Sequence, residues 1–365
     1  MPLEKSIFDL ATPVLLLDLS TAERNIQQAA DYVQDKPVRL RPHFKNHKCV
    51  PLAKRQLAAG GCVGMTTATV EEAAVLVGAG VDDILIANQI VGAAKINRLV
   101  QLANQATVRA VVDSADNADP IAEAARNSGA EFGALVEIDI GSNRCGVAPG
   151  ASTVDMVHYL LDCQGIRFDG LHAYHGHAVN KLDATEREQL ARDSMQLAID
   201  TRRQIESAGI ACPILSGAGA STYRVVAEMD GVDELQIGTY VTMDWSYKQR
   251  APEFDLALTV LASVIGTRPD QLVLDVGVKG VAHEYGPPQI LDHPEFEVIR
   301  FLAEEHTVVS APHHQLQVGD RLHVVPSHAC MTCNLHRQMV VREGETIRDV
   351  WPISARGYDL NAYEQ

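Results

Sequence analysis

Short apolar runs alternate with amphipathic segments from Val14 to about Tyr240. The apolar runs cover residues 14–17, 38–40, 64–66, 84–87, 109–112, 134–138, 170–173, 214–216 and 235–237. Helical patterns lie between them, for example over residues 70–76 and 186–205. This repeated strand and helix order predicts a parallel (β/α)8 TIM-type barrel. An open doubly wound sheet is the alternative, but no G-x-G-x-x-G motif follows the first strand.

The pattern changes after Tyr240, where longer strand-like runs are separated by turn residues with little helix between them. These runs cover residues 256–265, 271–275, 318–325 and 337–341. They predict an antiparallel β domain. We therefore expect two domains, an α/β barrel over residues 1–247 and a C-terminal β domain over residues 248–365. The first residues of the chain are candidates to pair with the β domain.

The composition is that of a soluble globular protein, with 46% hydrophobic and 21% charged residues. The formal charge of −16 argues against nucleic acid or an anionic membrane as partner, because both require a basic face. No signal peptide or membrane-length apolar run is present, so we expect a cytoplasmic protein. Seven scattered cysteines predict reduced thiols rather than a disulfide framework.

The motif R-P-H-F-K-N-H-K at residues 41–48 places Lys45 between two histidines and beside Lys48, just after an apolar run. A lysine crowded by cations loses its proton more readily, and a neutral amine can attack an aldehyde. The carboxyl end of a barrel strand is also where barrel chemistry collects. We interpret Lys45 as a Schiff-base lysine for pyridoxal phosphate. A solvated basic turn that binds a phosphate, or nothing, is the alternative.

Two later strand ends carry a pattern suited to a phosphate. Residues 216–222, S-G-A-G-A-S-T, end one apolar run and open a helix, so the chain allows close backbone approach there. The next run ends in Q-I-G-T-Y at residues 236–240, and barrel phosphate sites often use the last strands. The candidate cofactor residues in these loops are Ser221, Thr222, Gln236, Gly238, Thr239 and Tyr240.

The stretch from His328 to His336 holds two histidines and two cysteines. On spacing alone, His328, Cys330, Cys333 and His336 could form a structural zinc site, although ligand pairs usually come from separate segments. A reduced loop without metal is a second interpretation. In a third, His328 and Cys330 alone bind a divalent cation, which leaves positions open for water and substrate, as a catalytic metal needs.

These motifs, over nearly the whole chain, resemble the alanine-racemase-like, fold-type III pyridoxal phosphate enzymes. Within that fold the chain resembles the branch with D-threonine aldolase, 3-hydroxyaspartate aldolase and D-serine dehydratase. The resemblance implies that Lys45 carries the cofactor, that Arg144 lies near its phenolate oxygen, and that Tyr174 lies against its ring. It further implies that Gln236 faces the pyridine nitrogen and that His328 and Cys330 hold a divalent metal. Zinc, manganese and magnesium are candidates, and Cys330 favours a borderline-soft ion such as zinc.

The resemblance implies a lyase, expected as a homodimer, that acts on a β-hydroxy D-amino acid. We favour an aldolase that releases glycine and an aldehyde, because His172, His175 and His177 could supply a base or a cation near the β-substituent. A dehydratase that releases ammonia and an oxo acid is the alternative. A racemase needs no metal, and the non-catalytic cofactor carriers of this fold lack the β domain, so both are disfavoured.

Overall fold

The computed structural model describes residues 5–300 and 303–358. Its contacts divide the chain into two units. The barrel unit comprises Ala29–Lys45 and Ala53–Gly238, together with Tyr358, the last residue described. The β unit comprises the N-terminal segment through Gln28, Asn46–Leu52 and Thr239–Gly357. The contacts change from one unit to the other at Thr239, earlier than the boundary after residue 247 that the strand pattern suggested.

The barrel unit is built on a parallel sheet of eight strands in the order β2-β9-β8-β7-β6-β5-β4-β3. The two terminal strands approach each other, because Thr66 N donates to Pro42 O at 2.8 Å and Leu40 bridges to Cys62. The expected barrel architecture is therefore confirmed as a curled, barrel-like sheet. The strands are β2 (Arg39–Leu40), β3 (Met65–Thr67), β4 (Asp83–Ile86), β5 (Thr107–Val112), β6 (Phe132–Ile138), β7 (Ile166–Ala173), β8 (Ile214–Gly217) and β9 (Glu234–Leu235).

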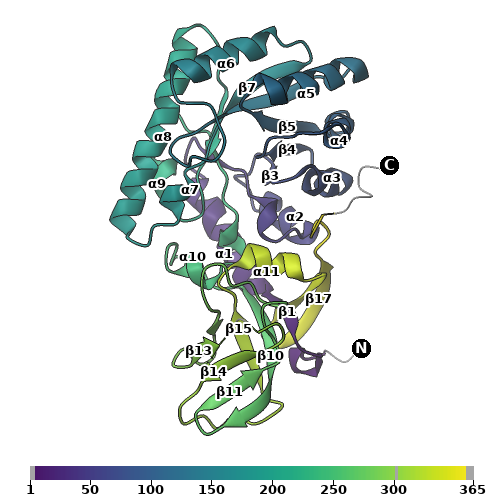
Figure 1. Cartoon of the computed structure of the whole chain (residues 1–365), viewed down its shortest axis with the longest axis vertical. Helices are drawn as coiled ribbons and strands as arrows, with labels where there is room; N and C mark the ends of the chain where they lie inside the picture. The colour runs from purple at the N-terminus through teal and green to yellow at the C-terminus, as the bar shows by residue number, and fades with distance from the viewer. Residues whose placement is uncertain (1–4, 301–302, 359–365) are drawn as a thin grey trace. The chain divides into compact units, whose positions relative to one another are not determined.

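Helices follow the strands, and Figure 1 shows α3, α4, α5, α6 and α8 around them. Every residue of β6 is buried, as expected of a strand covered on both faces. Leu85, Val111 and Leu135, on three adjacent strands, form one buried cluster. The helices are α1 (Leu19–Val33), α2 (Val50–Ala58), α3 (Val70–Gly78), α4 (Ala93–Ala103), α5 (Ala115–Ser128), α6 (Ala151–Asp162), α7 (Gly176–Val179), α8 (Ala184–Ser207) and α9 (Tyr223–Ala227).

The β unit contains a nine-stranded, mostly antiparallel sheet. Its strands are β1 (Val14–Asp18), β10 (Leu258–Arg268), β11 (Gln271–Leu274), β12 (Gln289–Ile290), β13 (Glu297–Arg300), β14 (Thr307–Ser310), β15 (Arg321–Val325), β16 (Gln338–Glu343) and β17 (Thr346–Pro352). Two short helices, α10 (Trp245–Lys248) and α11 (Ala329–Leu335), belong to it. Three 3-10 turns complete the described elements: η1 (Ile7–Asp9), η2 (Phe44–Asn46) and η3 (Thr239–Val241).

The N-terminal strand β1 corrects the sequence interpretation. Its apolar run was expected to open the barrel, but β1 pairs antiparallel with β10 and parallel with β16. Leu16 packs in a buried cluster with Ile7, Leu261 and Val340. That strand assignment was therefore wrong, because β1 belongs to the sheet of the β unit. The other eight apolar runs correspond to β2–β9.

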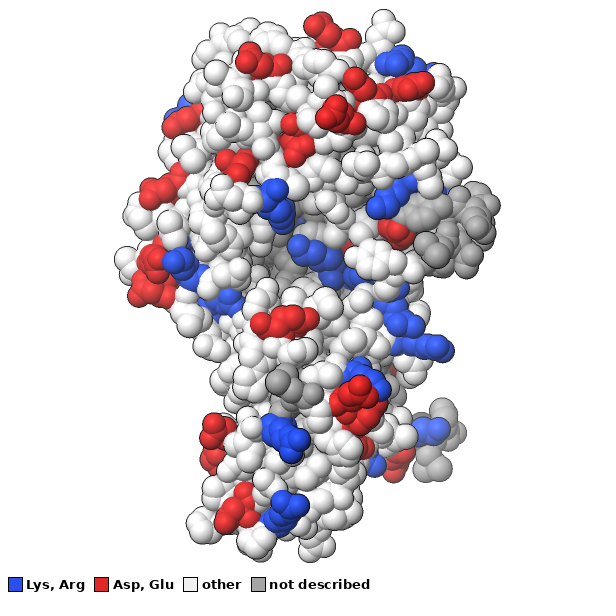
Figure 2. Space-filling model, in the orientation of Figure 1, with Lys and Arg blue, Asp and Glu red and all other residues white. Residues whose placement is uncertain are grey.

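The surface of the protein carries many acidic side chains, as its formal charge of −16 leads us to expect. Figure 2 shows carboxylate side chains scattered over the visible face of the protein. Among the described residues, no helix is both long enough and apolar enough to span a bilayer.

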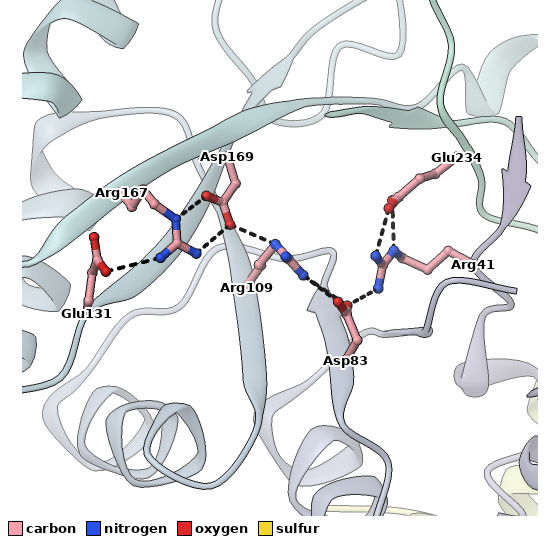
Figure 3. A network of polar contacts seen from close by, with 7 residues as sticks. All are labelled: Arg41, Asp83, Arg109, Glu131, Arg167, Asp169 and Glu234. Carbon is pink, nitrogen blue, oxygen red and sulfur yellow. Dashed lines mark hydrogen bonds and ion pairs between the residues drawn. The ribbon is translucent and has the colours of Figure 1, made fainter. Parts of the chain in front are cut away.

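A chain of alternating charges connects strands of the barrel unit (Figure 3). Arg41 makes two bonds of 2.7 Å to Glu234 and one of 2.6 Å to Asp83. Arg109 continues the chain from Asp83 to Asp169, with contacts of 2.9 and 2.7 Å. Asp83 and Glu234 are the first residues of β4 and β9, so the network lies toward the amino ends of these strands. Charge pairing at this end of a barrel supports stability, because barrel chemistry collects at the opposite, carboxyl end of the strands.

Replacing Arg41 with methionine should destabilise the protein strongly. The Arg41 side chain is 2% exposed and that of Glu234 is 7% exposed, so the substitution leaves a buried carboxylate without its bidentate partner. We expect a loss of about 3–5 kcal/mol in the free energy of unfolding, measured by urea denaturation. Arg167→Met is the matched control, because that arginine side chain is 47% exposed and should cost less than about 1 kcal/mol. Equal losses of unfolding free energy in the two variants would show that the burial of an arginine does not determine its contribution to stability.

Candidate active site

Lys45 lies in the 3-10 turn η2, directly after the end of β2. The chain is held there by backbone bonds from His43 N to Ile237 O and from Thr66 N to Pro42 O, both 2.8 Å. Lys45 is exposed, whereas Phe44 and Asn46 on either side of it are buried. This turn therefore fixes the backbone while the Lys45 side chain is exposed.

The neighbours of Lys45 in the motif, His43, His47 and Lys48, each have a different environment or contact. Burial, then the charge of Lys45, holds the pKa of His43 well below its ordinary value, so the His43 imidazole is neutral. The Nδ1 atom of His47 accepts from Cys49 N at 3.1 Å. Lys48 donates from Nζ to Asn334 Oδ1 at 3.0 Å, within the β unit. The two histidines that flank Lys45 are thus part of the buried framework of the turn.

Arg144 and Tyr174, the two residues expected beside the cofactor ring, lie close to each other. The Arg144 guanidinium lies 5.3 Å from the centroid of the Tyr174 ring, and its Nη2 lies 3.3 Å from Glu137 Oε1. Burial opposes ionisation of Glu137, but His172, Gln89 and Arg144 outweigh it and lower the pKa of Glu137 to about 2. Glu137 is therefore a permanent carboxylate that directs the exposed Arg144. Sequence reasoning missed this role, although Glu137 directly precedes the loop that carries Arg144.

A second polar chain links β7, β8 and the loop after β9. His172 Nε2 lies 3.4 Å from Gln236 Oε1, and Gln236 Nε2 donates to Ser216 Oγ at 2.9 Å. The Gln236 oxygen can only accept a hydrogen bond, and the role of the His172 nitrogen depends on the tautomer of the ring. The second nitrogen, Nδ1, is buried without a hydrogen-bond partner and lies 3.7 Å from Glu137 Oε1. These contacts hold the Gln236 amide in one orientation.

His175 and His177 each lie beside a hydroxyl group. Burial, followed by the charge of His177, lowers the pKa of His175 to about 3, so His175 is neutral. Its Nε2 lies 2.9 Å from Thr222 Oγ1, and His177 Nε2 lies 3.1 Å from Ser194 Oγ. Burial therefore disfavours a cation at His175, one of the two roles, base or cation, that the histidine cluster was expected to supply.

The Gly/Ser loop after β8 has a backbone suited to close approach. Ala218 has a φ of 71°, a left-handed conformation that is uncommon for a residue with a side chain. A Cβ on Gly219 would lie 2.9 Å from Val179 Cγ2, so only glycine fits there. Thr222 Oγ1 accepts from Gly219 N at 3.2 Å, and Ser221 Oγ donates to Val179 O at 2.9 Å. The two hydroxyl groups thus shape the loop.

The loop after β9 continues into η3. Gln236 N donates to Gly217 O at 2.6 Å, which ties Gln236 to the last residue of β8, and Gly238 follows two residues later. Thr239 O accepts from Met243 N at 2.7 Å, and Tyr240 is buried with its ring 5.5 Å from that of Phe254. Tyr240 therefore fills the core of the β unit, a task that sequence reasoning did not anticipate for this candidate.

His328 and Cys330 lie at the start of α11, where His328 is the N-cap residue. Burial alone would lower the pKa of His328, but Cys330, Asp244 and Glu284 raise it above its ordinary value. The surroundings of this histidine therefore favour a positive charge. His328 Nδ1 is buried without a hydrogen-bond partner and lies 3.6 Å from Glu284 Oε2.

The four-ligand zinc site that the spacing allowed is not formed. Cys333 is fully buried, and burial raises the pKa of its thiol well above the ordinary value. His336 Nε2 lies 2.8 Å from Gly280 O and is engaged there. Within residues 5–300 and 303–358, no three His, Cys, Asp or Glu side chains are grouped to hold one metal. The structural-zinc interpretation is therefore wrong for these residues.

Two further residues organise the metal candidates and gave no signal in the sequence. Asp244 is fully buried and accepts from Ala329 N at 2.9 Å and from Tyr247 N at 2.8 Å. Asn46 donates from Nδ2 to Cys330 Sγ at 3.5 Å. Both are common polar residues in ordinary surroundings, so only their tertiary contacts show that they support His328 and Cys330.

The residues present fit the two groups that this fold implies. At Gly219 a Cβ atom would lie too close to Val179, and Ala218 has a left-handed backbone conformation. This loop can therefore bring its backbone close to a phosphate group. The buried, unpartnered nitrogen of His328 and the nearby thiol of Cys330 are suitable donors for a borderline-soft divalent ion. Lys45, Arg144, Gln236 and this loop would hold pyridoxal phosphate.

Two family models match the chain. Residues 17–245 match the model described as "Alanine racemase, N-terminal domain", and residues 257–342 match "Putative serine dehydratase domain". The D-threonine aldolase of Arthrobacter sp. is 37% identical over 354 residues, which are 95% of this chain and 93% of that protein. The 3-hydroxy-D-aspartate aldolase of Paracoccus denitrificans (strain Pd 1222) is 34% identical over 96% of this chain and 93% of its own length.

Solved structures agree with these relatives. D-threonine aldolase from Filomicrobium marinum superposes with a TM-score of 0.94 at 36% identity, covering 98% of this chain and 99% of that one. A D-threo-3-hydroxyaspartate dehydratase has a TM-score of 0.87 at 27% identity over 97% of this chain and 100% of its own. That structure is of a cysteine-to-alanine mutant in the metal-free form. The chain is therefore an enzyme of the alanine-racemase-like lyase family to which D-threonine aldolase, 3-hydroxy-D-aspartate aldolase and D-threo-3-hydroxyaspartate dehydratase belong.

Proposed function

We propose that this enzyme is a pyridoxal phosphate- and divalent metal-dependent aldolase that cleaves a β-hydroxy D-amino acid. The substrate is 3-hydroxyaspartate or D-threonine, and the products are glycine with glyoxylate or acetaldehyde. The observation that carries the proposal is the similarity over nearly the whole chain to two aldolases, at 37% and 34% identity. We further propose that it acts in the cytoplasm as a homodimer.

Lys45 would hold the cofactor through its side-chain amine. Pyridoxal phosphate, when bound, supplies an electron sink for the bonds at the substrate Cα. The accessible side chain on a buried turn supports this role, because the backbone is fixed while the amine remains reachable. The loops after β8 and β9, with Ser221, Thr222, Gly238 and Thr239, hold the phosphate end.

Arg144 and Tyr174 orient the ring from one side. Glu137 keeps a full negative charge across the neutral range, because its pKa is about 2, and it therefore holds the Arg144 guanidinium in place. The Arg144 guanidinium is then available to donate hydrogen bonds to a phenolate oxygen. Tyr174 supplies a flat aromatic face beside it.

Gln236 presents a neutral amide toward the pyridine nitrogen. Its orientation is held from two sides, by contacts with His172 Nε2 and with the Ser216 hydroxyl. An amide cannot supply the fixed positive charge that an arginine would supply at this position. Gln236 would therefore offer the pyridine nitrogen a hydrogen-bonding amide rather than a charged partner.

His328 and Cys330 bind the divalent metal, for which zinc, manganese and magnesium are candidates. A metal at these residues, when bound, supplies a Lewis acid that lowers the pKa of a hydroxyl group. The negative surroundings that raise the pKa of His328 support a cation there. Asp244 holds the backbone between the two ligands by accepting from Ala329 N.

A dehydratase is the second candidate, and one observation favours it. The similar dehydratase was solved in a metal-free form with one cysteine replaced by alanine. A cysteine is therefore a candidate metal ligand in that dehydratase, as Cys330 is in this chain. The histidines do not separate the two reactions, because His172 and His175 are buried and engaged. The higher identity to the aldolases therefore decides our preference.

Incubation with D-threonine, D-serine and both D-3-hydroxyaspartates, with and without added divalent metal, should separate the two reactions. We expect glycine in equal amount to the aldehyde, with little ammonia, from D-threonine or a 3-hydroxyaspartate. Aldehyde and glycine are measured in the same sample, with ammonia assayed in parallel. Pyruvate or oxaloacetate with stoichiometric ammonia would establish the dehydratase instead.

A further inference from the structure

Asn46 is the residue after the proposed cofactor lysine, and its side chain contacts a proposed metal ligand. It follows Lys45 directly in η2, and its side chain is 1% exposed. Its Nδ2 atom lies 3.5 Å from Cys330 Sγ, a hydrogen-bond distance for sulfur. Asn46 is therefore placed to act on the sulfur atom that we propose as a metal ligand.

A second contact holds the Asn46 amide in the orientation that this requires. Thr242 Oγ1 donates to Asn46 Oδ1 at 2.9 Å, and Thr242 is fully buried. With the oxygen engaged by the hydroxyl, the amide N–H group faces the sulfur. A metal-bound thiolate has no proton to donate, so the opposite orientation would place a carbonyl oxygen against a negative sulfur. The metal-bound form therefore favours the orientation seen here.

The backbone on both sides of this contact is constrained. Met243, next to Thr242, has a φ of 52° and is fully buried, and Lys48 also has a φ of 52°. Left-handed backbone at residues with side chains costs energy and persists only where the surroundings impose it. The Asn46–Thr242 pair is thus fixed by its flanking residues, which limits how far the N–H group can move from Cys330.

We propose that Asn46 is a positioning residue that tunes Cys330 as a metal ligand through an N–H···S hydrogen bond. The inference rests on the proposed function, since it assumes that Cys330 binds the metal. Partners that hydrogen-bond to a ligand orient it and adjust its donor strength, and their loss typically lowers metal affinity about 10–100-fold. The bond stabilises the negative charge on sulfur and directs its lone pairs.

Cobalt titration of the metal-free, cofactor-loaded enzyme tests this proposal without measuring turnover. Wild-type protein should show a sulfur-to-cobalt charge-transfer band in the difference spectrum. In Asn46→Ala, we expect cobalt affinity to fall by about tenfold. The band should also move to longer wavelength, because the sulfur lone pairs lose a stabilising donor. Thr242→Val, which retains Asn46 but releases its amide, should shift both quantities in the same direction by less.

Asn334→Ala is the matched control, because Asn334 lies on α11 with Cys330 but accepts from Lys48 Nζ and Gly357 N. It should leave the cobalt band at the wild-type wavelength. An unchanged band and affinity in Asn46→Ala would overturn the positioning role while the metal site stands. If wild-type protein shows no sulfur-to-cobalt band, the proposed metal ligand itself is wrong, and this inference is overturned with it.

Discussion

Lys45→Ala should reduce the lyase activity by at least about 10³-fold, because it removes the amine that we propose binds the cofactor covalently. The folded structure should tolerate the change, since the Lys45 side chain is exposed while its neighbours carry the packing. Borohydride reduction of the wild-type enzyme, followed by peptide mapping, should locate the cofactor on the peptide that contains Lys45. The variant should give no labelled peptide.

Lys48→Ala provides the matched control for this experiment. Lys48 belongs to the same motif, but its Nζ donates to Asn334 Oδ1 in the β unit. The labelled peptide of this variant should still carry the cofactor at position 45. A covalent label that persists in Lys45→Ala, or that maps to Lys48, would refute the assignment.

Removal of the divalent metal should abolish turnover while the absorbance of the bound cofactor remains. His328 and Cys330 lie in the β unit, on a different element from Lys45, so the loss of metal should not release the cofactor. His328→Ala and Cys330→Ala should behave alike and lose about 10²–10⁴-fold in activity, as expected when a Lewis acid worth several kcal/mol is removed. Metal content is measured by elemental analysis and the cofactor by its visible band.

His336→Gln separates this catalytic role from a structural one. His336 lies in the same cysteine- and histidine-containing stretch, but it is engaged with Gly280 O at 2.8 Å, and glutamine retains a donor. This variant should keep both its metal and its activity. If chelation unfolds the protein, or if His336→Gln loses metal as His328→Ala does, the metal is structural. Full activity after removal of the metal would eliminate the proposed role of His328 and Cys330.

Much of the fold followed from local sequence patterns. The apolar runs that became β2–β9 were identified because each barrel strand is buried and is followed by an amphipathic helix. Lys45 was identified because its motif follows the end of such a run. Arg144 and Tyr174 were identified by resemblance, and the structure brings their side chains together.

The errors occurred where partners are distant in sequence. The run at Val14–Asp18 has the composition of a barrel strand, but β10 and β16 supply its partners, and nothing local to the run specifies them. The buried network is a similar case. Arg41 pairs with Glu234, 193 residues away, so each charge alone resembles a surface residue. Burial changes that interpretation, because an isolated charge could not remain there.

The sequence by itself determined the two domain types, the candidate lysine and the histidine–cysteine pair, because each is a local pattern of apolar spacing or of reactive side chains. Tertiary structure decided which of these groups are available for chemistry. It neutralised His175 by burial, engaged His336 with a backbone carbonyl, and placed Asn46 and Asp244 against Cys330 and Ala329. The physical reason is that protonation, orientation and hydrogen bonding depend on neighbours that the folded chain brings from distant positions.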